Sequence, residues 1–150
     1  MPRSCAYVAG PLDSGGAYYE KVAVGLVSPK VREENEKRLG GFVEHLRSTL
    51  PYPVFDPGTL KVDGWTDAQH GAFFIRVLEK VAKEAWFING WEFSHGATRE
   101  FMHCTSLKIP CLNEMGGIID LNAGRMMIGN AAEYVSSLGL DASRLRSRLR

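Results

Sequence analysis

Short apolar runs alternate with longer amphipathic segments along this chain. The apolar runs end at or near turn residues, which is typical of buried strands; they lie at 5–9, 52–55, 85–89 and 109–112. Between them, apolar residues recur at helical spacing, with charged residues on the other face; we predict helices at 30–49, 67–84, 97–107 and within 118–138. Strand and helix therefore alternate, which predicts an α/β fold with a doubly wound parallel sheet in a single domain.

Signals at the helix ends support these predictions. Pro29 stands in the first turn of the helix predicted over 30–49, and Thr66 is placed to cap the next helix. The inward faces of these two helices are expected to hold Val31, Leu39, Phe42, Val43, Leu46, Phe73, Phe74, Val77, Leu78 and Val81. Residues 17–30 are ambiguous, and we interpret them as a lid or a longer loop.

Composition narrows the class of protein. The chain has 150 residues and a formal net charge of +1, which gives no general reason to expect a nucleic-acid partner. Its three cysteines lack metal-ligand spacing, and we interpret them as core residues of a reduced compartment. The N-terminal apolar run is too short for a signal peptide, and no run is long enough to span a bilayer. These features predict a cytoplasmic protein without a membrane partner.

The last ten residues differ from the rest. Residues 141–150 hold four arginines and one acid, and we separate them as an arginine-rich tail from a domain over 1–140. Such a tail can contact RNA or an acidic partner. A solvated or frayed C-terminus is the commoner outcome and the one we expect.

The architecture itself indicates where a ligand would bind. In parallel sheets, ligands bind beyond the carboxyl ends of the strands, where the turns at 10–16, 56–58 and 90–96 would gather. The turn at 13–16, Asp-Ser-Gly-Gly, offers backbone N–H groups to an anion. The stretch 90–100, Gly-Trp-Glu-Phe-Ser-His-Gly-Ala-Thr-Arg-Glu, leads from a strand into a helix, so the helix N-terminus would also face an anionic ligand.

Three residues near this edge could carry chemistry. Glu100 follows small and hydroxylic residues that leave space for a ligand, and its carboxylate could attack an electrophilic sugar carbon; otherwise it is a solvated helix residue. Tyr7 could hydrogen-bond that carboxylate or be a core tyrosine. Glu92 could act as acid, base or acceptor for a sugar hydroxyl, or lie at the surface. His95 and His103 lack a third ligand at metal spacing, so we expect no metal and no cofactor.

Four segments resemble the nucleoside 2-deoxyribosyltransferase superfamily. They are 7–11 (Tyr-Val-Ala-Gly-Pro), 55–57 (Phe-Asp-Pro), the turn at 90–100, and 107–112 (Leu-Lys-Ile-Pro-Cys-Leu), within a resemblance that spans about 5–135. The most similar branches are small proteins with a Gly-Trp-Glu-x-Ser-x-Gly-Ala turn and the nucleoside 5′-monophosphate N-glycosidases. The resemblance implies a flavodoxin-like, Rossmann-like fold, a homodimer or larger assembly, and cleavage or transfer at the N-glycosidic bond of a nucleoside or nucleotide.

The resemblance also implies roles for individual residues. The family's nucleophilic glutamate falls on Glu100 and its orienting tyrosine on Tyr7. Ser94 stands where enzymes acting on free nucleosides carry an aspartate and the monophosphate hydrolases carry a serine that contacts phosphate. A hydroxyl at a helix N-terminus can donate to a phosphate, whereas a carboxylate would repel it. The full substrate-binding set is then expected to be Gly10, Ser14, Gly15, Gly16, Asp56, Ser94, Gly96, Arg125 and Asn130.

Two features of the resemblance bear on assembly and activity. Residues 126–133 resemble the segment that reaches into the neighbouring subunit's site, so Arg125 or Asn130 could contact a substrate across a dimer interface.

The family's usual aspartate before the third strand is replaced by Arg76, which cannot act as a general acid near neutral pH. Either Glu79 or Glu92 substitutes, or catalysis is weak, or the chain is a nucleotide-binding sensor that does not cleave its ligand.

Overall fold

The computed structural model describes residues 2–12, 15–26 and 29–150 and contains a four-stranded, all-parallel sheet. Its strands are β1 (Cys5–Ala9), β2 (Val54–Phe55), β3 (Ala82–Phe87) and β4 (Cys111–Asn113), in the spatial order β2-β1-β3-β4. Parallel neighbours require crossover connections, and helices supply them here. The predicted α/β doubly wound fold is confirmed.

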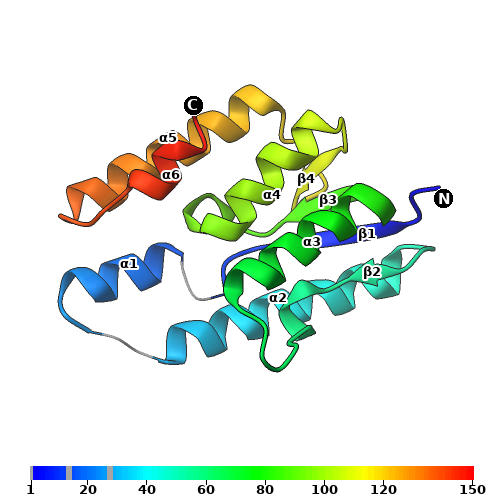
Figure 1. The fold of residues 1–150 in the computed structure, drawn as a ribbon, viewed down its shortest axis with the longest axis horizontal. Coiled ribbons are helices and arrows are strands. Elements are labelled where there is room, and N and C mark those ends of the chain that lie inside the picture. Colours follow the sequence, from blue (N-terminus) through cyan, green and yellow to red (C-terminus); the bar gives the residue numbers. More distant parts are fainter. Residues whose placement is uncertain (1, 13–14, 27–28) are drawn as a thin grey trace.

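Helices cover both faces of the sheet (Figure 1). They are α1 (Gly16–Ala23), α2 (Pro29–Thr49), α3 (Asp67–Val81), α4 (His95–Ser106), α5 (Leu121–Ser137) and α6 (Ser143–Ser147), with short 3-10 helices η1 (Pro57–Thr59) and η2 (Trp91–Phe93). The predicted cap at Thr66 is confirmed, because Thr66 and Gln69 form a reciprocal capping box at the start of α3. None of the helices described combines the length and apolar character needed to cross a membrane.

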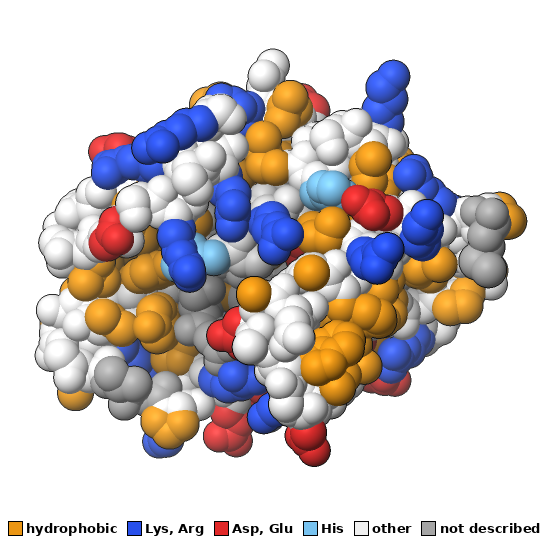
Figure 2. All heavy atoms as spheres, in the orientation of Figure 1, with side chains coloured by type: hydrophobic (Ala, Val, Ile, Leu, Met, Phe, Trp, Pro, Cys, Tyr) orange, Lys and Arg blue, Asp and Glu red, His pale blue; other side chains and the backbone are white. Residues whose placement is uncertain are grey.

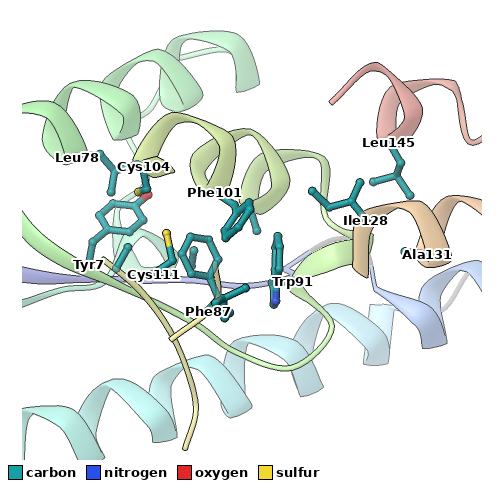
Figure 3. Packing of buried hydrophobic residues seen from close by; sticks show 14 of the residues in the cluster. Tyr7, Leu78, Phe87, Trp91, Phe101, Cys104, Cys111, Ile128, Ala131 and Leu145 are labelled. Carbon is teal, nitrogen blue, oxygen red and sulfur yellow. The ribbon is translucent and has the colours of Figure 1, made fainter. Parts of the chain in front are cut away.

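The two faces of the sheet carry separate hydrophobic clusters. Along β1, Ala6 and Val8 face α2, whereas Tyr7 and Ala9 face the side covered by α3, α4 and α5. The cluster on that second side is rich in aromatic rings, and Figure 3 shows Phe101 beside Phe87 and Trp91 at its centre. The three cysteines are buried and free, as the sequence predicted.

The boundary between α3 and β3 differs from the prediction. The helix ends at Val81 and the strand begins at Ala82, so residues 82–84 belong to the sheet rather than to the helix. The pairing of β3 with β1 shifts register between Cys5 and Ala6. This irregularity interrupts the two-residue alternation of buried positions in β3, and it is this alternation that identifies a strand in the sequence.

The interpretation of residues 17–30 as a lid or loop is wrong for residues 17–23, which form most of α1. The amphipathic pattern of α1 is short, and the residue that caps this helix is a glycine, Gly15. The sequence therefore carries no clear signal for the start of the helix. Tyr19 is the buried anchor of this helix, and its ring lies 6.3 Å from that of Phe93 in η2. Helix α1 is therefore held against the turn that leads into α4.

The C-terminal residues are also folded, so the expected solvated or frayed terminus is wrong. Helix α6 packs on α5 and α4, and Leu145 and Ala142 are buried in the main core. Ala142, Leu145 and Leu149 are spaced three and four apart, which places them on one helical face. The arginines of this segment are thereby held at defined positions on the domain.

The predicted gathering of turns at one edge of the sheet is confirmed. Phe93 lies 3.7 Å from the position that a Cβ would take at Gly16, and Pro11 lies 3.5 Å from the corresponding position at Gly90. Leu12 approaches Gly58 similarly, at 3.6 Å. The turns after β1, β2 and β3 therefore touch one another beyond the carboxyl ends of these strands.

Candidate functional site

A buried hydrogen bond joins the middle of β1 to α4, the helix that begins in the turn after β3. Tyr7 Oη donates to Glu100 Oε1 at 2.8 Å, across a sequence separation of 93 residues. Tyr7 is held in the middle of the sheet by register with Phe55 on β2 and Ala85 on β3. Figure 3 shows its ring directed from β1 toward α4, beside Cys104. The structure thus brings together the two residues that the sequence suggested as nucleophile and orienting tyrosine.

Burial sets the electrostatics of this pair. Glu100 is 8 % exposed, and burial raises the pKa of its carboxyl to about 7, while the bond from Tyr7 and the charge of Arg99 act in the opposite direction. Burial and the neighbouring Glu100 raise the pKa of Tyr7 well above its usual value. Near neutral pH the tyrosine is therefore a fixed donor, and the carboxyl exchanges between its protonated and its ionised form.

An aromatic wall lies next to the pair. The ring of Phe55 stacks on that of Tyr7, with 5.6 Å between centroids, and Phe74 of α3 meets Phe55 at 6.3 Å. These rings exclude water from one side of Tyr7, and this exclusion accounts for part of the desolvation of the tyrosine. Neither Phe55 nor Phe74 was singled out from the sequence as a site residue, because an aromatic residue in an apolar stripe is ordinarily core.

Ser94 is the N-cap of α4. Its Oγ accepts a hydrogen bond from Ala97 N at 3.2 Å, and its carbonyl accepts one from Thr98 Oγ1 at 2.8 Å. The cap leaves the hydroxyl proton of Ser94 available for donation. Gly96 is exposed in the first turn, and Ser94 Oγ is 3.9 Å from the position of a Cβ there. The predicted helix began at residue 97, so the capping role of Ser94 was missed.

The glycines proposed for substrate binding have identifiable structural roles. Gly10 admits Ile88, whose Cγ1 lies 2.2 Å from the position of an added Cβ, so any side chain there would displace the core. Gly15 caps α1 with φ +125°, a conformation that favours glycine. Gly16 begins α1 beside Phe93. Ser14, also predicted to bind substrate, lies outside the described residues.

Two further acids take different positions. Asp56 is buried, and its carboxylate caps η1 by accepting a hydrogen bond from Gly58 N at 2.8 Å. The charge of this carboxylate contributes to the raised pKa of Tyr7. Glu92 is half-buried in η2, and burial raises the pKa of its carboxyl. Its Oε2 atom is shielded from solvent and has no hydrogen-bond partner among the described residues. A desolvated carboxyl of this kind is suited to proton transfer.

The remaining sequence candidates lie away from the pair. Arg125 on α5 donates to the carbonyl of Leu149 at 2.5 Å, and Asn130 on the same helix is exposed. Arg76 is exposed on α3, whereas Glu79 one turn later is hydrogen-bonded to His103 Nε2 at 2.9 Å. Contact of Arg125 or Asn130 with a substrate across a dimer interface stays a prediction.

The structure adds three arginines that were not predicted as site residues. Arg144 on α6 and Arg148, the C-cap of α6, contact His95, the first residue of α4, and the charge of Arg99 on α4 acts on Arg148. The helical spacing of Leu145 and Leu149 is the sequence signal that could have indicated a packed C-terminal helix, and with it the positions of Arg144 and Arg148 beside His95. Among the described residues, no group of three His, Cys, Asp or Glu side chains is arranged to hold a metal ion.

In comparisons with known proteins, no family model, curated protein or solved structure matches this chain significantly. The site must therefore be interpreted from its own residues.

Proposed function

We propose that this protein cleaves or transfers at the N-glycosidic bond of a nucleoside or nucleoside 5′-monophosphate, with Glu100 as nucleophile. The supporting observation is the buried bond from Tyr7 Oη to Glu100 Oε1, which joins β1 to the helix that follows the turn after β3. In parallel sheets, ligands bind beyond the carboxyl ends of the strands, where this turn lies. A glutamate held by a tyrosine and partly desolvated is suited to attack on an anomeric carbon, because a poorly solvated carboxylate is a better nucleophile.

In the proposed reaction, the ionised Oε2 of Glu100 attacks C1′ of the sugar while Tyr7 holds Oε1. The bond from C1′ to the base nitrogen breaks, and the base takes a proton as it leaves. Glu92, with its pKa raised by burial, is the proposed proton donor. Water or a second base then attacks C1′, gives its proton to the Glu92 carboxylate and releases Glu100 as a carboxylate, so the configuration at C1′ is retained.

The proposed assembly is a homodimer or larger homo-oligomer. Its support is a set of exposed apolar side chains on α5 and the segment before it, a pattern that often marks a protein interface: Met115, Ile118, Leu121, Met126, Met127 and Tyr134. The neighbouring subunit would then bring its Arg125 or Asn130 toward the site. Sedimentation of the purified protein checks this assembly.

The decisive experiment compares Glu100→Ala with the wild type on a panel of nucleosides and 5′-monophosphates, with and without an acceptor base. We expect base release to fall by about 10³-fold or more, because the nucleophile is lost. Glu84→Ala is the matched control, since Glu84 also accepts a hydrogen bond from a tyrosine but lies on β3, outside the proposed site. Turnover that survives in Glu100→Ala would refute the mechanism.

A second candidate is a nucleotide-binding protein that does not cleave its ligand. It is favoured by the exposed Arg76 on α3, where the resembling family carries an acid, and by the engagement of Glu79 with His103. Calorimetric binding of a 5′-monophosphate with no free base after prolonged incubation would favour this candidate over the enzyme.

A further inference from the structure

Three arginines from α4 and the C-terminal segment lie close enough for the charges of two to act on the third, and two of them contact His95. Arg144 Nη1 lies 3.3 Å from His95 Nδ1, and Arg148 Nη2 donates to the carbonyl of His95 at 3.1 Å. Arg99, one turn further along α4, places its Nη1 3.3 Å from the position of a Cβ at Gly71 on α3. We call Arg99, Arg144 and Arg148 the arginine cluster. Figure 2 shows Lys and Arg side chains concentrated over α6 and beside α4.

The acids near this cluster, Glu100 and Asp141, form no ion pair with it among the described residues. None of its three arginines lies within ion-pairing distance of a described Asp or Glu side chain, whereas Arg146 of the same helix pairs with Glu133 at 3.1 Å. The charges of Arg144 and His95 act on Asp141, whose Oδ1 already accepts a hydrogen bond from Ser143 N at 2.8 Å. Positive charge is therefore in excess where α6 meets α4.

One member of the cluster, Arg148, is partly desolvated. The Nε atom of Arg148 is shielded from solvent and lacks an acceptor among the described residues. Burial lowers the pKa of Arg148, and the charges of Arg99 and Arg144 lower it further. Burial also lowers the pKa of His95, as do the charges of Arg144 and Arg148, and its Nε2 lies 3.1 Å from Tyr19 Oη. Like charges held together with an unsatisfied N–H are unfavourable unless an anion is bound.

Arg99 connects the cluster to the chemistry of the site. It precedes Glu100, and its charge lowers the pKa of that carboxyl while also acting on Arg148. A ligand with its reactive carbon at Glu100 and an anionic group on the far side of Arg99 would contact both. Guanidinium forks match the oxygens of a phosphate monoester.

We propose that the arginine cluster binds the 5′-phosphate of the substrate, so that the C-terminal helix α6 selects a nucleoside 5′-monophosphate over the free nucleoside. This inference rests on the proposed function for the identity of the substrate. Its geometric basis is the contact of Arg144 and Arg148 with His95 and the absence of an ion-paired acid for the three arginines among the described residues, and this basis stands independently of any cleavage at Glu100.

The test measures binding of inorganic phosphate by titration calorimetry to the wild type and to Arg99→Gln, Arg144→Gln and Arg148→Gln. Each substitution should weaken binding by about tenfold or more, because a charge-assisted hydrogen bond is lost. Arg146→Gln is the matched control: it removes the same charge from α6 but from the side chain that pairs with Glu133, and it should change affinity less than about twofold. Circular dichroism checks that each variant is folded.

Three outcomes would overturn the proposal. One is unchanged phosphate affinity in all three cluster variants. Another is an equal loss in Arg146→Gln, which would indicate general surface charge. The third is tight binding of a single-stranded RNA that Arg146→Gln and Arg148→Gln weaken alike, which would indicate a polyanion surface.

A second measurement separates this inference from the proposed function. The four common 2′-deoxynucleoside 5′-monophosphates and their nucleosides are titrated against the wild type and Arg148→Gln. Loss of affinity confined to the monophosphates supports the cluster, and it does so even if no base is ever released. If Arg148→Gln binds the monophosphates with wild-type affinity and still releases base from them, the proposed phosphate-binding role of the cluster is overturned. The proposed role of Glu100 is then unaffected.

Discussion

Two tyrosine–glutamate hydrogen bonds lie on the same sheet and differ in their surroundings. Tyr7 Oη reaches Glu100 Oε1 at 2.8 Å in the core, and Tyr52 Oη reaches Glu84 Oε1 at 2.5 Å in a partly exposed position. In the second pair, the hydrogen bond itself is the main reason that the pKa of Tyr52 rises to about 12. In the first pair, burial is the main cause for both partners.

The comparison shows that the bond alone does not make a reactive carboxyl. The bond from Tyr7 stabilises the ionised form of Glu100, but desolvation by the surrounding core outweighs it, and the pKa therefore rises. Glu84 also accepts a bond from Trp86 Nε1 at 3.1 Å and lies where water reaches it. Perturbed acids of the first kind concentrate at functional sites.

The largest expected difference between the pairs is in the pH dependence of stability. The pKa of Glu100 rises from an ordinary 4.5 to about 7 on folding, so the folded state holds the proton more tightly. The stability that this proton provides is complete below pH 4.5 and is lost as pH rises to 7, by about 3 kcal/mol. Urea unfolding across this range should show the loss in the wild type and not in Glu100→Gln. Glu84→Gln is the control, and an equal change in both variants would contradict the role of burial.

Removing each tyrosine hydroxyl should have a smaller effect. Tyr7→Phe leaves a buried carboxylate oxygen without its donor and should destabilise the protein by about 1.5–3 kcal/mol at pH 8, against at most about 1 kcal/mol for Tyr52→Phe. Because the bond from Tyr7 lowers the pKa of Glu100, Tyr7→Phe should also move the acidic limb of the turnover profile to higher pH. A limb that stays in place or moves downward would show that Tyr7 does not stabilise the ionised form.

The smallest effect on the pKa of Glu100 should come from removing the charge of Arg99, because this charge is the weakest of the three influences on that pKa. Arg99→Gln should raise the midpoint of the same limb by less than Tyr7→Phe does, because the arginine is exposed and screened by solvent. Arg76→Gln on α3 is the matched control and should leave the midpoint unchanged. A larger shift of the midpoint from Arg76→Gln than from Arg99→Gln would contradict this prediction, because it would show that the charge acting on Glu100 comes from α3 rather than from α4.

Much of the fold and part of the site could be predicted from the sequence. The predicted spans of α2 and α5, the cap at Thr66 and the gathering of turns at one edge follow from local periodicity and end signals, which are encoded within a few residues. Misplaced boundaries arose where tertiary pairing overrode local preference, as in β3, where the register shift against β1 hides the strand pattern. Helix α1 and helix α6 were missed because each is short and its stability depends on packing rather than on propensity.

By itself, the sequence determined the alternation of strands with the four longer helices and marked Tyr7, Glu92 and Glu100 as candidates through their positions next to turns, while the family resemblance added Ser94. Only the tertiary structure decided that Tyr7 bonds Glu100 across 93 residues, that burial brings the carboxyl near neutrality, and that α6 carries two arginines to His95. The reason is physical: periodicity records which face of an element is buried, whereas a contact or a pKa depends on which other elements pack there.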